Sequence, residues 1–197
     1  IPWTNVSNSP FRLFKRWIHE GGISAPLIVH WPSVIKESRI ESEQLHIMDI
    51  PATAIHAANA KYPDEYNGNK IKQIEGESFL DLLVNRWSRE KPMYWEHEGN
   101  QGIRKGEWKL VKEYDQDWEL YNLSEDRTEL NDLSSKEKKR VEEMAIEWEE
   151  WAKISNVLPW PVNPNVLAKR LEGDHAHIHQ HRGPTAGQIA DGKGKFL

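Results

Sequence analysis

The apolar residues in the first sixty positions predict one strand followed by one helix. Residues 23–32, which read ISAPLIVHWP, form a short apolar and β-branched run that follows two glycines and ends in proline. Such a run is typical of a buried strand in a parallel or mixed sheet. Residues 33–42 are polar and predict a loop. Pro51 precedes the alanine-rich residues 52–60, which favour a helix because proline suits a first helical turn and alanine propagates it.

Residues 61–121 change from turn-rich sequence to strand-like alternation. Residues 61–76 have little apolar content and several turn-forming pairs, so they predict a surface connection. Residues 78–83 predict one or two turns of helix. Four short alternating segments follow, separated by turn sequences: residues 92–97, 102–104, 108–111 and 118–121. This spacing predicts an antiparallel meander of about four strands.

A charged helix is expected to cover this sheet. Ser134-Ser-Lys-Glu137 reads as a capping box at its start. Four apolar residues then recur at helical spacing: Val141, Met144, Trp148 and Trp151. We interpret this stripe as the face that packs on the sheet and not as a ligand site. Pro159 and Pro161 are expected to end the helix, and residues 159–197 to form an extended tail.

The composition narrows the possible functions. The chain has 197 residues, a net charge of −5 with acidic and basic residues interleaved, and no Cys. The charge pattern argues against a nucleic-acid surface. The absence of Cys excludes disulfides, thiolate metal sites and thiol nucleophiles. No apolar run is long enough to cross a membrane, and the start lacks Met and a leader sequence, so we expect the interior of a longer chain.

Six short motifs follow one another along the chain. They are a Lys five residues before Glu-Gly-Gly, a strand that ends in Trp-Pro, an Asp before a Pro-x-Thr helix, a Gly-x-Ser turn, and two segments of a small sheet with its closing turn. In this chain they lie within Lys15–Ile23, Ala25–Pro32, His46–Thr53, Gly76–Leu80, Tyr94–Val111 and Glu119–Leu133. Taken in this order over residues 8–155, they resemble the C-terminal half of an arylsulfatase, in the sulfatase family.

This resemblance implies a fold. The fold would be α/β, the C-terminal part of an alkaline-phosphatase-like sulfatase fold with a small antiparallel β-sheet covered by a helix. Residues 1–90 would end the large α/β domain. Residues 91–158 would form the C-terminal subdomain, and residues 159–197 the extended tail.

The resemblance also implies an activity, which is the hydrolysis of sulfate esters of a sulfated small molecule or glycan. Calcium and a formylglycine nucleophile would both be supplied by residues outside this chain, and the missing N-terminal catalytic half would be its partner. By itself the chain is therefore expected to be inactive. The family further implies a periplasmic or secreted protein. The interleaved charges and the lack of a long apolar run predict no nucleic acid or membrane as partner.

Lys15 is the residue that the resemblance places in the active site. It matches the family Lys that reaches the sulfate oxygens, and a compact ammonium can neutralise charge on a sulfate and on its transition state. The alternative is a solvated surface lysine. Glu20 is expected to fix the Gly-Gly turn by hydrogen bonding, and Gly21 and Gly22 to adopt backbone conformations closed to other residues. Asn8-Ser-Pro-Phe-Arg12 is similar to the sulfatase nucleophile signature, but Asn8 stands where Cys or Ser is required, so we interpret it as a coincidence.

Four further residues are candidate substrate contacts. His97, Asn100 and Arg104 lie at a strand end and its turn, where binding residues gather. The resemblance places this sheet beside the active-site mouth, which implies that His97 and Asn100 contact the non-sulfate part of a substrate. An ordinary polar hairpin is the alternative. His19 has the chemistry of a general acid or base, and a packing or capping role is the alternative.

The tail contains four alternating histidines: His175, His177, His179 and His181. Imidazole binds Zn, Ni or Cu readily, but His-rich tails also bind metals adventitiously, so no functional metal site is assigned in this chain.

The sequence alone leaves two other functions open. One is a phosphodiesterase or phosphonate hydrolase of the same superfamily, which the identity of the nucleophile would distinguish. The other is a non-catalytic glycan-binding module that uses some of the ten Trp, which glycan binding without hydrolysis would distinguish.

Overall fold

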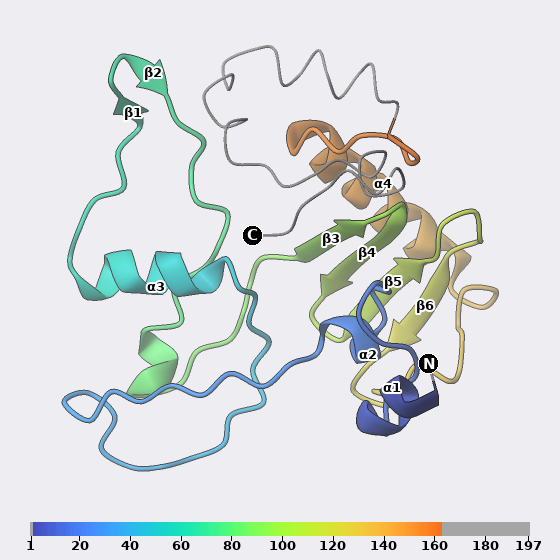
Figure 1. Cartoon of the computed structure of the whole chain (residues 1–197), viewed down its shortest axis with the longest axis horizontal. Helices are drawn as coiled ribbons and strands as arrows, with labels where there is room; N and C mark the ends of the chain where they lie inside the picture. Colours follow the sequence, from blue (N-terminus) through green and yellow to red (C-terminus); the bar gives the residue numbers. More distant parts are fainter. Residues whose placement is uncertain (1, 163–197) are drawn as a thin grey trace, which may run out of the picture. The chain divides into compact units, whose positions relative to one another are not determined.

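The computed structural model describes residues 2–162, and the chain divides into two units, residues 1–157 and 158–197. The first unit contains, in chain order, α1 (Pro2–Ser7), α2 (Glu20–Ile23), α3 (Asp49–Ala57), β1 (Glu65–Tyr66), β2 (Asn69–Lys70), η1 (Asp81–Leu83), β3 (Met93–His97), β4 (Asn100–Lys105), β5 (Trp108–Lys112), β6 (Glu119–Asn122) and α4 (Lys138–Ile154) (Figure 1). In the part of the chain that is described, no helix is both long and apolar enough to cross a membrane. The predicted His-rich segment of the tail lies outside the described residues.

Strands β3 to β6 form an antiparallel sheet in the order of the sequence, as the turn spacing predicts. Ile103 pairs with Leu110 and Leu110 pairs with Leu120, so these three side chains point to the same face. The residues beside them in sequence point to the opposite face. The sheet therefore presents two faces of different composition.

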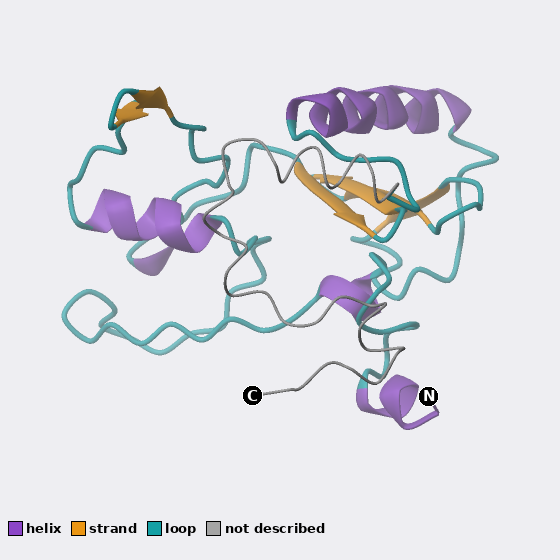
Figure 2. Cartoon of the chain, turned by 45° about the horizontal axis from the view of Figure 1, so that its top comes forward, coloured by secondary structure: helices purple, strands orange, loops and turns teal. Residues whose placement is uncertain are grey.

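Helix α4 covers the face that carries Ile103, Leu110 and Leu120 (Figure 2). Met144, Trp148 and Ala152 complete this buried cluster, and the indole N–H of Trp148 donates to the carbonyl of Trp95 at 3.0 Å. The ring of Trp151 stacks on Tyr94 with centroids 5.1 Å apart. The prediction that the tryptophan stripe is a packing face is confirmed.

The start of α4 differs from the prediction. The helix begins at Lys138, its N-cap is Glu137, and that cap makes no side-chain hydrogen bond. Ser134 lies in a preceding turn, where its hydroxyl donates to Asp132 Oδ2 at 2.8 Å. The predicted capping box is wrong because Asp132 engages the serine before the helix starts.

The opposite face of the sheet is covered by the segment that leads into α2. Ile18 packs with Val111, Tyr121 and Leu123 in a second buried cluster. A Cβ on Gly102 would lie only 2.6 Å from Ile18 Cγ2, so β4 requires glycine at this point for Ile18 to reach the sheet. Both faces are thus buried, one by a helix and one by a loop.

The predicted strand at residues 23–32 does not form in the described structure. Ile23 ends α2, the following residues have no regular structure, and Ile28 is 90% exposed. A strand needs neighbouring strands to satisfy its backbone hydrogen bonds, and the described residues place none beside this run. An apolar pattern without such partners does not form a strand.

Helix α3 agrees with the prediction and is fixed by a buried polar cluster around Asp49. Asp49 is fully buried and accepts hydrogen bonds from the backbone N–H of His46 at 2.6 Å and of Glu77 at 2.8 Å, and from Arg89. A Cβ on Gly76 would lie 2.1 Å from the carbonyl of Met48. The Gly-x-Ser turn and the start of α3 are therefore packed directly together.

Candidate functional site

Lys15 lies on a tight turn between α1 and α2. The N–H of Trp17 donates to the carbonyl of Phe14 at 3.2 Å, which closes the turn around Lys15 and Arg16. Lys15 is exposed, and its ammonium makes no hydrogen bond or ion pair with the described residues. Arg16, by contrast, pairs with Glu98 at 2.9 Å. The turn thus presents one free cation to solvent.

The backbone on both sides of this turn is anchored by side-chain hydrogen bonds. The amide of Asn8 donates to the carbonyl of Leu13 at 2.7 Å and also to that of Gly21. The indole of Trp17 donates at 3.0 Å to Glu113, the residue that follows β5. Lys15 therefore projects from a loop whose ends are held against the sheet.

Gly21 and Gly22 are required by close packing. A Cβ on Gly21 would lie 2.1 Å from the carbonyl of Arg12, and one on Gly22 would lie 1.9 Å from the carbonyl of Trp17. Neither glycine has a positive φ, and both belong to α2. The prediction of a conformation closed to other residues is wrong here, because these glycines are needed for space.

A buried cluster of charges holds α2 on the sheet. Lys109 on β5 is 0% exposed, and its ammonium donates to Glu20 Oε1 at 2.9 Å and lies 2.9 Å from Glu129 Oε1. Glu129 also accepts the backbone N–H of Glu20 at 2.7 Å. Arg104 lies 3.8 Å from the other oxygen of Glu20, and burial lowers the pKa of Arg104. Two cations thus balance two carboxylates.

This cluster changes the interpretation of Glu20 and Arg104. The carboxylate of Glu20 contacts Lys109, and the backbone N–H of Glu20 donates to Glu129, so Glu20 attaches the Gly-Gly segment to the rest of the fold and makes no side-chain hydrogen bond within the turn. Arg104 faces Glu20, with its Nε also 3.4 Å from the carbonyl of Gly106, which favours a structural role. Sequence reasoning missed Lys109, although its alternation with Leu110 indicates that it points away from the α4 face.

A second cluster is centred on Glu119 of β6. Its Oε2 accepts from Arg12 at 2.5 Å, from His19 Nε2 at 3.0 Å and from the Tyr121 hydroxyl at 2.6 Å. Burial by itself favours the protonated carboxyl, but the hydrogen bonds of His19 and Tyr121 and the neighbouring positive charge lower the pKa of Glu119 to about 2. His19 is 0% exposed, so its position favours the packing alternative over substrate contact. Arg12 of the incomplete nucleophile motif likewise serves to attach the loop.

The turn between β3 and β4 lies directly beside Arg16. His97 is exposed at this turn, whereas Asn100 is only 5% exposed. The amide of Asn100 donates to the carbonyls of Arg16 at 3.2 Å and His97 at 2.9 Å, and its oxygen accepts the N–H of Tyr114 at 3.0 Å. Of the predicted residues, Asn100 thus bonds directly to the Lys15 turn, His97 lies exposed on the neighbouring hairpin, and His19 is enclosed.

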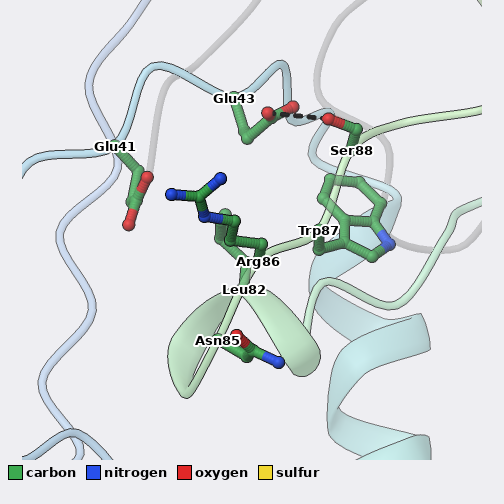
Figure 3. Close-up of a pocket in the computed structure, with 7 residues that line it drawn as sticks. All are labelled: Glu41, Glu43, Leu82, Asn85, Arg86, Trp87 and Ser88. Carbon is green, nitrogen blue, oxygen red and sulfur yellow. Dashed lines mark hydrogen bonds between the residues drawn. The ribbon is translucent and has the colours of Figure 1, made fainter.

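An open cavity of about 590 Å³ lies elsewhere, lined by Glu41, Glu43, Leu82, Asn85, Arg86, Trp87 and Ser88. Figure 3 shows the guanidinium of Arg86 directed toward the space between Glu41 and Glu43. Glu43 already accepts the hydroxyl of Ser88 at 2.9 Å, and Glu41 pairs with Arg39. Two carboxylates at its rim make this cavity unfavourable for a sulfate.

The described residues do not by themselves form a site for calcium or formylglycine, which the family resemblance assigns to residues outside this chain. Within residues 2–162 no three His, Asp or Glu side chains are arranged to hold a metal ion. The chain has no Cys, and Asn8 occupies the position where the nucleophile signature requires Cys or Ser.

Comparisons with known proteins identify the family to which this chain belongs. A family model described as N-sulphoglucosamine sulphohydrolase, C-terminal, matches residues 11–153. The chain belongs to this sulfatase C-terminal family. The match includes the Lys15 turn, the charge clusters around Lys109 and Glu119, and the whole sheet with most of α4. It confirms the resemblance inferred from the order of the six motifs.

Individual members of the sulfatase family are also similar to the chain. An uncharacterized sulfatase of Schizosaccharomyces pombe is 32% identical over 158 residues, a match that covers 74% of this chain and 28% of that protein. A sulfatase of Formosa agariphila is 30% identical over 146 residues, covering 65% of this chain and 26% of the relative. The chain thus spans little more than a quarter of the length of these relatives.

The fold is also that of a sulfatase C-terminal portion. The crystal structure of Ps i-CgsB matches with a TM-score of 0.61 and 27% identity, covering 74% of this chain and 32% of that one. The same protein is known in complex with k-i-k-neocarrahexaose. The predicted fold class, a small antiparallel sheet covered by a helix at the end of a sulfatase fold, is confirmed.

Proposed function

We propose that this chain is the C-terminal portion of an enzyme that hydrolyses sulfate esters, and that Lys15 binds the sulfate. The observation that carries the proposal is the free ammonium of Lys15 on a turn whose neighbours are held by Asn8 and Asn100. An unpaired surface lysine is usually mobile, whereas this one projects from a fixed backbone. Membership of the sulfatase C-terminal family supports sulfate as its ligand.

The chemistry of Lys15 follows from its charge. A sulfate ester is an anion, and more negative charge develops on its oxygens as the bond between sulfur and the ester oxygen breaks. An ammonium placed at these oxygens stabilises the transition state more than the ground state. Because Lys15 has no partner to give up among the described residues, it can bind sulfate without breaking an existing ion pair.

The nucleophile and calcium of the complete enzyme are proposed to come from residues outside this chain. In a sulfatase they supply the attack on sulfur and further neutralisation of the sulfate. We also propose that residues 1–90 belong to the large α/β domain, residues 91–158 to its C-terminal subdomain and residues 159–197 to a tail. On this proposal the chain alone releases no sulfate.

A sulfated carbohydrate is the proposed substrate class. The solved relative that binds k-i-k-neocarrahexaose supports this choice, because its name denotes a chain of six sugars. His97 is exposed on the turn beside Arg16, and we propose that it contacts the non-sulfate part of the substrate. A periplasmic or secreted location fits an enzyme that acts on such chains. The family match does not favour a phosphoryl-transfer enzyme or a non-catalytic module.

The test measures sulfate release by the complete enzyme with Lys15→Ala. Loss of one group that stabilises an oxyanion typically lowers kcat by about 10² to 10³. Lys139→Ala is the matched control, because Lys139 is an exposed lysine on α4, 89% accessible, with only a 3.6 Å contact to Glu143. If Lys15→Ala retains the activity of Lys139→Ala, the role assigned to Lys15 is wrong.

A further inference from the structure

The residue next to Lys15 has an unusual backbone. Arg16 has a φ of 115°, in a region that residues other than glycine rarely adopt. Such a conformation persists only where the surrounding structure holds it, and it is enriched at functional sites. The contacts of Arg16 are therefore informative about what the turn is for.

Two contacts hold Arg16, and both come from the turn between β3 and β4. The guanidinium pairs with Glu98 at 2.9 Å, and the carbonyl accepts from Asn100 Nδ2 at 3.2 Å. Glu98 and Gly99 have φ of 52° and 82°, as in the tight two-residue turns that join hairpins. The hairpin turn thus holds Arg16 by its side chain and by its backbone at once.

The side chain of Asn100 uses all of its amide hydrogen-bond donors within the protein. It is nearly enclosed, both N–H groups of its amide are donated to backbone carbonyls, and its oxygen accepts a backbone N–H from Tyr114. No donor of the amide is left for a substrate. The predicted substrate contact is therefore better explained as a residue that acts through the Lys15 turn.

We propose that Arg16 and Asn100 are positioning residues for sulfate hydrolysis. The β3–β4 turn clamps Arg16 in its rare conformation, and this fixes the direction in which Lys15 leaves the turn. The inference rests on the proposed role of Lys15 in binding sulfate. It adds that the orientation of Lys15 depends on the hairpin and not on packing of the lysine itself, which is exposed.

The experiment uses two variants of the complete enzyme, with kcat, KM and melting temperature measured for each. Arg16→Gly adopts a φ of 115° without strain and removes the side-chain half of the clamp. Asn100→Asp has nearly the same shape but cannot donate to the carbonyl of Arg16. We expect kcat to fall by roughly 10- to 100-fold, because displacement of about 1 Å has effects of this size. We expect KM to change less and the melting temperature of Arg16→Gly to stay within a few degrees.

Asn69→Asp is the matched control. Asn69 also follows a hairpin turn and donates to a backbone carbonyl, that of Asn67 at 3.3 Å, but it is exposed on the small β1–β2 hairpin. This variant is expected to keep the kcat of the unaltered enzyme. If Asn100→Asp fails to fold, the kcat of Arg16→Gly alone tests the positioning role.

Three results separate the possible failures. Unaltered kcat in Arg16→Gly overturns the positioning role while sulfate hydrolysis stands. If the activity of the variants falls only in proportion to the amount of folded enzyme, the positioning role is overturned as well. An unaltered enzyme that releases no sulfate overturns the proposed function, and this inference with it.

Discussion

Lys109 Nζ lies 2.9 Å from Glu20 Oε1, with the lysine side chain fully enclosed and the glutamate 4% exposed. This pair joins the middle of β5 to α2, across 89 positions of sequence. Glu129 and Arg104 complete a cluster in which positive and negative charges are equal in number. The loop that carries Lys15 is thus attached to the sheet by a charge cluster in which Lys109, Glu20 and Glu129 are buried and Arg104 is partly exposed.

Lys109→Met is expected to destabilise the protein strongly. The substitution leaves the carboxylates of Glu20 and Glu129 buried together without their ammonium, and removing one partner of a buried ion pair costs about 3–5 kcal/mol. Lys105→Met is the control, because Lys105 makes an exposed pair with Glu147 at 2.9 Å, which is worth at most about 1 kcal/mol. Urea unfolding of both variants gives the comparison. Equal decreases in the free energy of unfolding of the two variants would show that burial of the cluster contributes nothing to stability.

Glu119 is expected to make stability fall at low pH. Its pKa in the folded protein is about 2, below the ordinary value of 4.5, so its contribution is complete above the ordinary value and is lost as the pH falls toward 2. Glu119→Gln should remove this pH dependence, which we expect to be about 1–3 kcal/mol after allowance for partial exposure.

Glu125→Gln is the control for this experiment, because Glu125 is exposed on the turn after β6. Thermal unfolding between about pH 5 and pH 2 should show a steeper decline for Glu125→Gln than for Glu119→Gln. Parallel declines would mean that the hydrogen bonds of Glu119 do not favour its ionised form.

Gly22→Ala is expected to displace α2. The added Cβ would lie 1.9 Å from the carbonyl of Trp17, so the backbone on one side must move, at a cost of about 2–4 kcal/mol. Gly68→Ala provides the comparison, because that site has open space but a φ of 78°, which costs about 1–2 kcal/mol. Melting temperatures should fall further for Gly22→Ala. The reverse order would mean that α2 accommodates a side chain.

Local patterns in the sequence predict the sheet and α4 well. The turns that separate β3 to β6 are short, and each strand pairs with its neighbour in sequence, so local spacing contains most of the information. The stripe that includes Trp148 likewise depends only on helical periodicity. The start of α4 was missed because Asp132 competes for Ser134, which residue type alone does not reveal.

Features that depend on distant partners were not predictable in the same way. A strand at residues 23–32 requires neighbouring strands, and the described residues supply none. The burial of Lys109 depends on Glu20 and Glu129, which lie far from it in sequence. His19 has the chemistry of a catalytic residue, but its contact with Glu119 encloses it. The family resemblance, and not residue chemistry alone, singles out Lys15, and the structure shows which contacts hold its turn.

The buried charges also determine how β5 can align with its neighbours. Lys109 and Leu110 point to opposite faces, so shifting the strand by one residue would exchange them. The shift would place an ammonium among Met144 and Trp148 and leave Glu20 facing a leucine. Both exchanges are costly, since each buries a charge without its counterpart. The ion cluster that attaches α2 therefore selects a single alignment of the sheet as the chain folds.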